Sequence, residues 1–268
     1  MKKILLPTDF SDNAQKAIDY ALYLFEKETC TFYLLHAYFN VPSATGNKMT
    51  AKEDLKQLAQ TLEAKNNSKH LFKTIMETDS VINLVNRTVI NKGVDFVFMG
   101  TKGSSAMREI LIGGNTTDVL KHLVFCPVVT VPEGHDHGLP EEIVFATDFK
   151  HRFEKHELVP LIILTKIWNS RLTVVHVHTE KELNDDQKQN KELLKQGLKP
   201  IKSKFMEIKM EDTIAGTLRN FEREKTEIGL LALLRTRHGY FQKLLREPVV
   251  RNMAFRTEVP FMVLPIVE

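Results

Sequence analysis

The segment that decides the fold reads VDFVFMGTKG (94–103), continues for nine residues, and then reads GGNT (113–116). An apolar strand that runs straight into glycines lets the backbone approach a ligand closely, because no side chain stands in the way. Residues 116–123 have helical periodicity. The start of such a helix presents free N–H groups and the positive end of its dipole. We therefore interpret this segment as a phosphate cradle between a buried strand and a helix.

The first half of the chain alternates strand and helix patterns. Short apolar runs predict strands at 4–6, 31–36, 71–76, 94–99 and 128–131. Amphipathic periodicity predicts a helix over 13–27, a second helix that begins with a capping box of Thr50 and Glu53, and a third with Asp79 as its N-cap. This alternation predicts an open parallel sheet that binds ligands beyond the carboxyl ends of its strands, at the topological switch point. Asp9, Ala37 and Gly100 each follow a predicted strand and are expected to share that crevice.

The chain is an internal duplication. KILLPTDF (3–10) resembles EIVFATDF (142–149), YLLHA (33–37) resembles VVHV (174–177), and CPVVTVP (126–132) resembles VPFMVLP (259–265). The segment between the copies, PEGHDHGLP (132–140), is rich in Pro and Gly and is typical of a linker. We predict an α/β protein with two tandem Rossmann-like open parallel five-stranded sheets flanked by helices, in domains 1–138 and 139–268.

Composition limits the class of protein. The chain has 268 residues, of which 43% are hydrophobic and 26% charged, as is usual for a soluble globular protein. The formal net charge of +3 gives no electrostatic reason to expect nucleic acid or membrane as a partner, and neither a signal peptide nor an apolar stretch of transmembrane length is visible. Cys30 and Cys126 lack metal-site spacing. We expect buried free thiols in a reducing compartment, and therefore a cytoplasmic protein.

With these residues in place, the chain resembles a tandem universal stress protein, of the family that has the adenine nucleotide α-hydrolase-like fold. The resemblance rests on PTD (7–9), LHA (35–37) and the spacing Gly100-x2-Gly103-x9-Gly113, and it covers nearly the whole chain. It implies a stress-response or signalling protein that binds ATP, or AMP or ADP, with Mg²⁺ as a further component. The nucleotide would act as a conformational ligand or as a slowly hydrolysed substrate.

The resemblance also implies roles for individual residues. Asp9 would contact the ribose and adenine, Ala37 would pack near the base, and the residues of the glycine loop would give the phosphates backbone N–H groups and a hydroxyl. Gly114 stands where the family often has serine, so we expect weaker phosphate binding. The full implied site comprises Pro7, Thr8, Asp9, Ala37, Met99, Gly100, Lys102, Gly103, Arg108, Gly113, Gly114, Asn115 and Thr116.

The second half departs from this pattern. Ala146 replaces the proline, LLRTRHGYF (233–241) stands where the glycine loop should be, and Arg246 and Glu247 align with the glycine pair. We expect nucleotide in the N-terminal half only, with a degenerate second half that packs on the first as an internal pseudo-dimer. Residues 128–131 and 262–264 are candidates for pairing across that contact. A homodimer and an unidentified protein partner remain open.

Several residues also have structural interpretations. Asp9 can serve as a helix N-cap, and His36 and His176, which end buried strands, are better read as structural histidines. His135 and His137 lack further metal ligands nearby. The basic cluster of the second half favours a solvated face or an interdomain contact, and 180–204 predicts an exposed helix; the cluster comprises Arg235, Arg237, His238, Lys243 and Arg246.

Competing functions follow from the same residues. The sequence has no Walker motif, kinase signature or nucleophile–base pair, so we expect binding, with slow ATP hydrolysis as the most that the site would support. The alternative is a nucleotide-independent interaction or scaffold protein of the same fold. An adenylating enzyme ranks last, because the chain lacks the additional cysteines and the pyrophosphate loop typical of that group.

Overall fold

A computed structural model of the chain describes residues 1–38, 48–65, 68–101, 114–136, 138–211, 213–236, 240 and 257–266. Its contacts divide the chain into two compact units, the first ending at Glu133 and the second beginning at Gly134. Each unit is an α/β structure. The sequence boundary at residue 138 stays a prediction.

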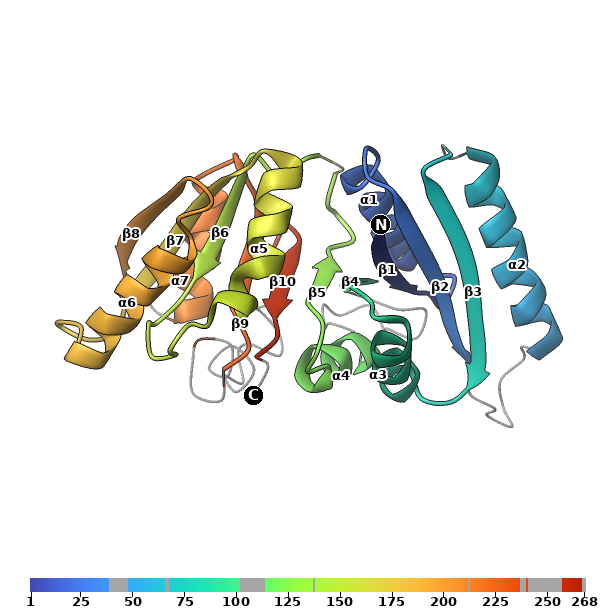
Figure 1. Cartoon of the computed structure of the whole chain (residues 1–268), viewed down its shortest axis with the longest axis horizontal. Helices are drawn as coiled ribbons and strands as arrows, with labels where there is room; N and C mark the ends of the chain where they lie inside the picture. The colour runs from blue at the N-terminus through green and yellow to red at the C-terminus, as the bar shows by residue number, and fades with distance from the viewer. Residues whose placement is uncertain are drawn as a thin grey trace. The chain divides into compact units, whose positions relative to one another are not determined.

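The first unit contains five parallel strands in the order β3-β2-β1-β4-β5, drawn in blue to green in Figure 1. Its elements are β1 (Lys2–Pro7), α1 (Asp12–Leu24), β2 (Cys30–Tyr38), α2 (Lys48–Lys65), β3 (His70–Thr78), α3 (Val81–Lys92), β4 (Phe96–Gly100), α4 (Gly114–His122) and β5 (Val128–Val131). The chain winds from β1 toward β3 and then from β4 toward β5. The switch point therefore lies between β1 and β4.

The burial of each strand follows from its place in this sheet. Every residue of β4 and β5 is buried, because helices cover both faces of a parallel sheet. The edge strand β3 is half exposed, and α2 packs against it and against β2. The aromatic core of the unit is continuous from helix to sheet: the Phe25 ring lies 5.9 Å from that of Phe96 and 6.0 Å from that of Phe98.

The second unit repeats this topology, with five parallel strands in the order β8-β7-β6-β9-β10. Its described elements are β6 (Glu142–Ala146), α5 (Lys155–Trp168), β7 (Arg171–His178), α6 (Asp185–Gly197), β8 (Ser203–Lys209), α7 (Ile214–Arg223), β9 (Ile228–Leu234) and β10 (Phe261–Leu264). The prediction of two tandem five-stranded parallel sheets is confirmed.

Two predicted helix starts are wrong. Helix α2 already begins at Lys48, so Thr50 lies inside its first turn and cannot form the expected capping box with Glu53. Helix α3 is capped by Ser80, whose side chain accepts the Asn83 N–H. The Asp79 carboxylate instead accepts the Ser80 N–H at 2.7 Å.

The exposed helix predicted over 180–204 is shorter and more buried than expected. It is α6, and it turns Gln187 and Asn190 into the protein rather than toward solvent. Asn184 caps it through a capping box with Gln187. The two buried polar residues hold backbone groups of the second unit, as described below.

Both cysteines of the chain lie in the first unit. Cys30 and Cys126 are buried free thiols, as predicted, and burial raises the pKa of Cys30 to about 12.

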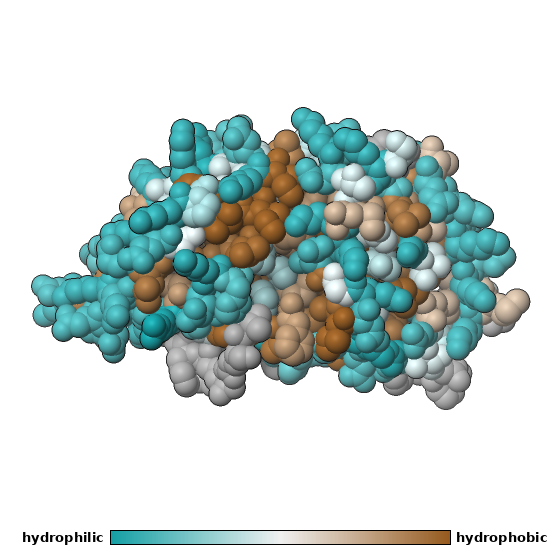
Figure 2. Space-filling model, in the orientation of Figure 1, coloured by the Kyte–Doolittle hydropathy of each residue, from teal (hydrophilic) through white to brown (hydrophobic). Residues whose placement is uncertain are grey.

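Apolar side chains gather over α5 (Figure 2), where Val159 is 46% exposed. Within the part of the chain that the structure describes, no helix combines the length and apolar character needed to cross a bilayer.

Candidate functional site

A pocket opens in the first unit at the carboxyl ends of β1, β2 and β4, at the switch point. It collects predicted site residues from four separate segments and adds four residues that the sequence did not single out for this role. Its lining comprises Pro7, Thr8, Asp9, Ala14, Leu35, His36, Ala37, Val81, Met99, Gly100, Gly114, Asn115 and Thr116. The other predicted site residues lie outside the described residues: Lys102, Gly103, Arg108 and Gly113.

The turn after β1 shapes one wall of the pocket. The Asp9 carboxylate accepts the Ser11 N–H at 3.1 Å and the Ser11 hydroxyl at 2.6 Å. Ser11 in turn accepts the Ala14 N–H and is the N-cap of α1. The alternative that Asp9 caps the helix is therefore wrong: Asp9 orients the capping residue and keeps its carboxylate at the pocket wall.

His36 supports the same turn from β2. Its Nδ1 lies 2.8 Å from the Thr8 carbonyl, and a carbonyl only accepts, so Nδ1 carries the proton. The Phe10 ring packs 4.7 Å from the imidazole, at a backbone φ of 63° that is rare for a bulky residue. The predicted structural role of His36 fits this geometry, and the residue also lines the pocket.

Asn13, in the first turn of α1, connects this helix to the ends of β4 and β5. Its side-chain Nδ2 donates to the Val131 carbonyl at 3.2 Å, and its Oδ1 accepts the Thr101 hydroxyl at 3.4 Å. A Cβ at Gly100 would lie 2.7 Å from both the carbonyl oxygen and Oδ1 of Asn13. Glycine is required at position 100 because the first turn of α1 passes directly over it. Sequence analysis missed Asn13, although an amide on the apolar face of a predicted helix is a signal.

The opposite end of the pocket is the N-terminus of α4. Gly114, Asn115 and Thr116 line it, and their N–H groups belong to the first turn, where a helix has no internal acceptors for them. The Thr116 hydroxyl donates to the Gly100 carbonyl at 2.9 Å. That hydroxyl is therefore engaged within the protein, and backbone N–H groups are the donors that this end offers an anion.

The second unit builds the same turn after β6. The Phe149 N–H donates to Thr147 Oγ1 at 3.1 Å, and Phe149 has a φ of 55°. His176 Nδ1 lies 2.9 Å from the Thr147 carbonyl, and its ring stacks 5.1 Å from that of Phe149. The duplicated Thr-Asp-Phe and His residues therefore form one local structure twice.

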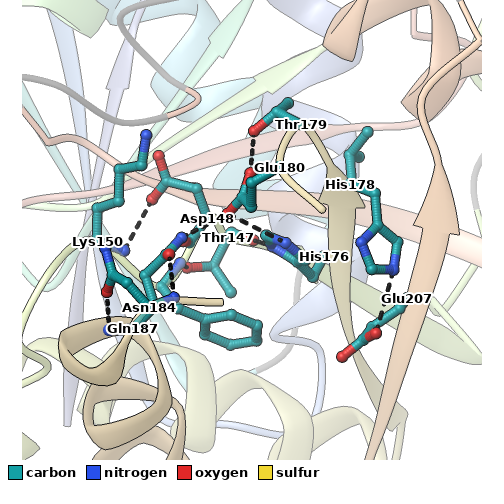
Figure 3. A network of polar contacts seen from close by, with 12 residues as sticks. Thr147, Asp148, Lys150, His176, His178, Thr179, Glu180, Asn184, Gln187 and Glu207 are labelled. Atoms are coloured by element: carbon teal, nitrogen blue, oxygen red, sulfur yellow. Dashed lines mark hydrogen bonds and ion pairs between the residues drawn. The ribbon is translucent and has the colours of Figure 1, made fainter. Parts of the chain in front are cut away.

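Polar side chains of the second unit, among them Gln187 and Glu180, gather around its copy of this turn (Figure 3). Gln187 donates to the Asp148 carbonyl and Asn190 to the Phe149 carbonyl, each at 2.9 Å. Asp148 is 4% exposed. Burial alone would raise the pKa of Glu180, but hydrogen bonds from Thr179 and Gln187 hold it below its usual value. The turn that borders an open pocket in the first unit is thus covered by polar side chains in the second.

Two other predicted clusters are only partly described. Arg235 is half-buried, and burial lowers the pKa of its guanidinium; the rest of its basic cluster lies outside the described residues. His137 is likewise not described, so the expectation for His135 and His137 is not tested. The described residues contain no group of three or more His, Cys, Asp and Glu side chains arranged to hold a metal ion.

The fold and the pocket together indicate a class of protein. Two tandem five-stranded α/β units, one with a switch-point pocket that ends at a helix N-terminus, are typical of small-ligand-binding proteins with an open parallel sheet. The sequence profile described as the universal stress protein family matches residues 1–132. Residues 1–132, which span the first unit, belong to the universal stress protein family, and the second unit repeats their strand order in tandem.

Individual relatives cover one half or the whole chain. Universal stress protein MJ0577 of Methanocaldococcus jannaschii is 26% identical over 143 aligned residues, covering 45% of this chain and 88% of the relative. Universal stress protein YxiE of Bacillus subtilis is 26% identical over 145 residues, covering 48% and 97%. A crystal structure of a universal stress protein from Archaeoglobus fulgidus covers 98% of both chains with a TM-score of 0.72 and 19% identity, which shows the shared tandem fold.

Proposed function

We propose that the first unit binds an adenine nucleotide in its switch-point pocket and that the protein uses this ligand as a conformational signal in a stress response. The observation that carries the proposal is that the two ends of the pocket differ in chemistry. One end offers a carboxylate and a strand terminus, and the other offers the first turn of α4. Ribose hydroxyls suit the first end and phosphates suit the second.

The adenine base would bind to backbone groups at the end of β2. Thr8 N–H donates to the Leu35 carbonyl at 2.8 Å, so the polar backbone groups of Leu35 face β1. Backbone orientation repeats every two residues along a strand, so the N–H and C=O of Ala37 point the same way, beyond the end of β1. One donor beside one acceptor matches the hydrogen-bonding edge of an adenine base.

The phosphate end determines which nucleotide fits. The α4 N-terminus would bind the phosphate chain, with Lys102 and Arg108 as cations and Mg²⁺ as a further ligand of the phosphates. ATP, ADP and AMP all present the same base and ribose, so the length of the phosphate chain would set their relative affinity. Asp9 is the only carboxylate among the described lining residues, which supports binding with at most slow hydrolysis.

The nucleotide site would be confined to the first unit, because the second closes its equivalent turn with Gln187 and Asn190. The two halves would pair as an internal pseudo-dimer, and a homodimer or another protein partner would receive the signal. Two buried free thiols suit a reducing, cytoplasmic environment.

A matched pair of variants tests this function. Asp9→Asn keeps the acceptor for Ser11 and removes the charge that would face the ribose, so we expect ATP affinity to fall by about 1.5–3 kcal/mol, roughly tenfold to a hundredfold. Asp148→Asn makes the same change in the second unit and should leave affinity unchanged. Calorimetric titration with Mg²⁺ and ATP measures both.

The pattern of affinities decides between the two candidate functions. Absence of ATP binding by the folded native chain would contradict the proposal and favour the nucleotide-independent interaction protein. If Asp148→Asn weakened ATP binding and Asp9→Asn did not, the nucleotide site would lie in the second unit, which would contradict the proposal.

A further inference from the structure

The crevice of the second unit contains a side chain of the protein itself. Tyr240 is 3% exposed, and its hydroxyl accepts the Val177 N–H at 2.9 Å while donating to the Val177 carbonyl at 2.6 Å. Its ring lies nearly parallel to that of His176, with 6.3 Å between centroids and 18° between planes. Burial raises the pKa of Tyr240, so the phenol is neutral and can donate and accept at once.

Val177 is the counterpart of Ala37 in the internal repeat. Thr147 N–H donates to the Val175 carbonyl at 3.0 Å, just as Thr8 donates to Leu35. The β6–β7 register ends at Ala146 and Val175, so the polar backbone groups of Val177, two residues on, point past the end of β6. The phenol therefore meets the same pair of backbone groups that the first unit directs toward its pocket.

We propose that Tyr240 is an internal ligand that occupies an aromatic subsite in the second unit, at the position equivalent to the base end of the first-unit pocket. A planar ring with a donor and an acceptor at its edge is the shared chemistry of a phenol and a nucleobase. The second unit would therefore be unable to bind a nucleotide for two reasons: Tyr240 fills the position of the base, and the glycine loop is absent from its sequence. When Tyr240 is removed, the subsite should accept a small planar molecule with an O–H or N–H edge.

The first test removes the Tyr240 ring by mutation and asks whether free phenol can take its place. Tyr240→Ala should lower the thermal midpoint, and millimolar phenol should restore several degrees of it by binding only the folded state. Benzene should restore clearly less, because it cannot bond to Val177. Phenol should not shift the native chain or Tyr240→Phe. A folded Tyr240→Ala protein that does not respond to phenol, or responds equally to benzene, would overturn the proposal.

A second test does not require Tyr240→Ala to fold. Tyr240→Phe keeps the ring and removes the hydroxyl, so the Val177 amide should exchange with solvent roughly tenfold faster, as follows from the loss of about one hydrogen bond. Tyr23→Phe, at an exposed tyrosine, is the control and should leave that rate unchanged. An unchanged Val177 rate in Tyr240→Phe would contradict the assignment.

The inference uses the proposed nucleotide site of the first unit only for comparison. Neither test contains a nucleotide, so failure of ATP binding and failure of phenol binding are separate results. If phenol binds Tyr240→Ala while ATP does not bind the native chain, the subsite stands and the nucleotide proposal falls.

Discussion

Gly100→Ala is expected to lower the free energy of unfolding by about 3 kcal/mol, at the upper end of what overpacking costs. The added Cβ would lie 2.7 Å from the carbonyl oxygen and 2.8 Å from the carbonyl carbon of Asn13. These are backbone atoms in the first turn of α1, so relief requires movement of the helix rather than rotation of a side chain. The bonds of Asn13 to Val131 and Thr101 would be strained at the same time.

Gly114→Ala is the matched control for that variant. Among the residues that the structure describes, a Cβ at Gly114 would meet no atom within 4 Å, and Ala is a better helix former than Gly. Urea unfolding followed by circular dichroism should show a lower midpoint for Gly100→Ala and an unchanged or higher one for Gly114→Ala. Equal midpoints in the two variants would show that α1 does not pass over Gly100 as closely as described.

Glu222 is expected to make the protein less stable as the pH rises from about 4.5 to 7. This carboxyl is 6% exposed, and its Oε1 accepts the N–H groups of Glu258 at 2.7 Å and Val259 at 3.0 Å. Burial raises its pKa from 4.5 to about 7, against the opposing effect of those two bonds. The folded protein therefore holds a proton that the unfolded chain releases. The stabilisation is complete below pH 4.5 and is lost as the pH passes 7, a change of up to about 3 kcal/mol.

Glu222→Gln tests this pH dependence. Glutamine keeps an acceptor for the two N–H groups and cannot ionise, so its unfolding free energy should exceed that of the native chain by up to about 3 kcal/mol at pH 8. The two proteins should converge toward pH 4.5. Glu224→Gln, at an exposed carboxylate one residue beyond Arg223, should keep the native slope. The same slope in Glu222→Gln and the native chain would rule out this carboxyl as the source.

Local sequence patterns predicted the parts of the fold that depend on local chemistry. The apolar runs of β1 and β4, the glycine that ends β4 and the repeated Thr-Asp-Phe turn all appear where the spacing indicated. Helix starts were less predictable, because neighbouring polar residues compete for the same role. Asp79 and Ser80 can each cap a helix, and only the backbone angles select Ser80.

Long-range contacts account for what sequence analysis missed. Asn13 reaches Val131 across 118 positions, and Tyr240 reaches Val177 across 63. Asn13 stands out only as an amide on the apolar face of its helix, and nothing in the segment around either residue indicates its distant partner. Sequence analysis expected the second half to be degenerate because of its altered loop, whereas the tyrosine that fills its crevice becomes visible only when the strands are assembled.

The most direct test of the account is amide hydrogen exchange of the native chain, mapped by mass spectrometry with and without saturating Mg²⁺ and ATP. We predict slower exchange in peptides that contain Ala37 and the first turn of α4, from Gly114 to Thr116, because their N–H groups would bond to the base and the phosphates. Peptides that contain Val177 should be unchanged, because Tyr240 already occupies that position. No protection at Ala37 and Gly114, or protection at Val177 instead, would contradict a single nucleotide site in the first unit.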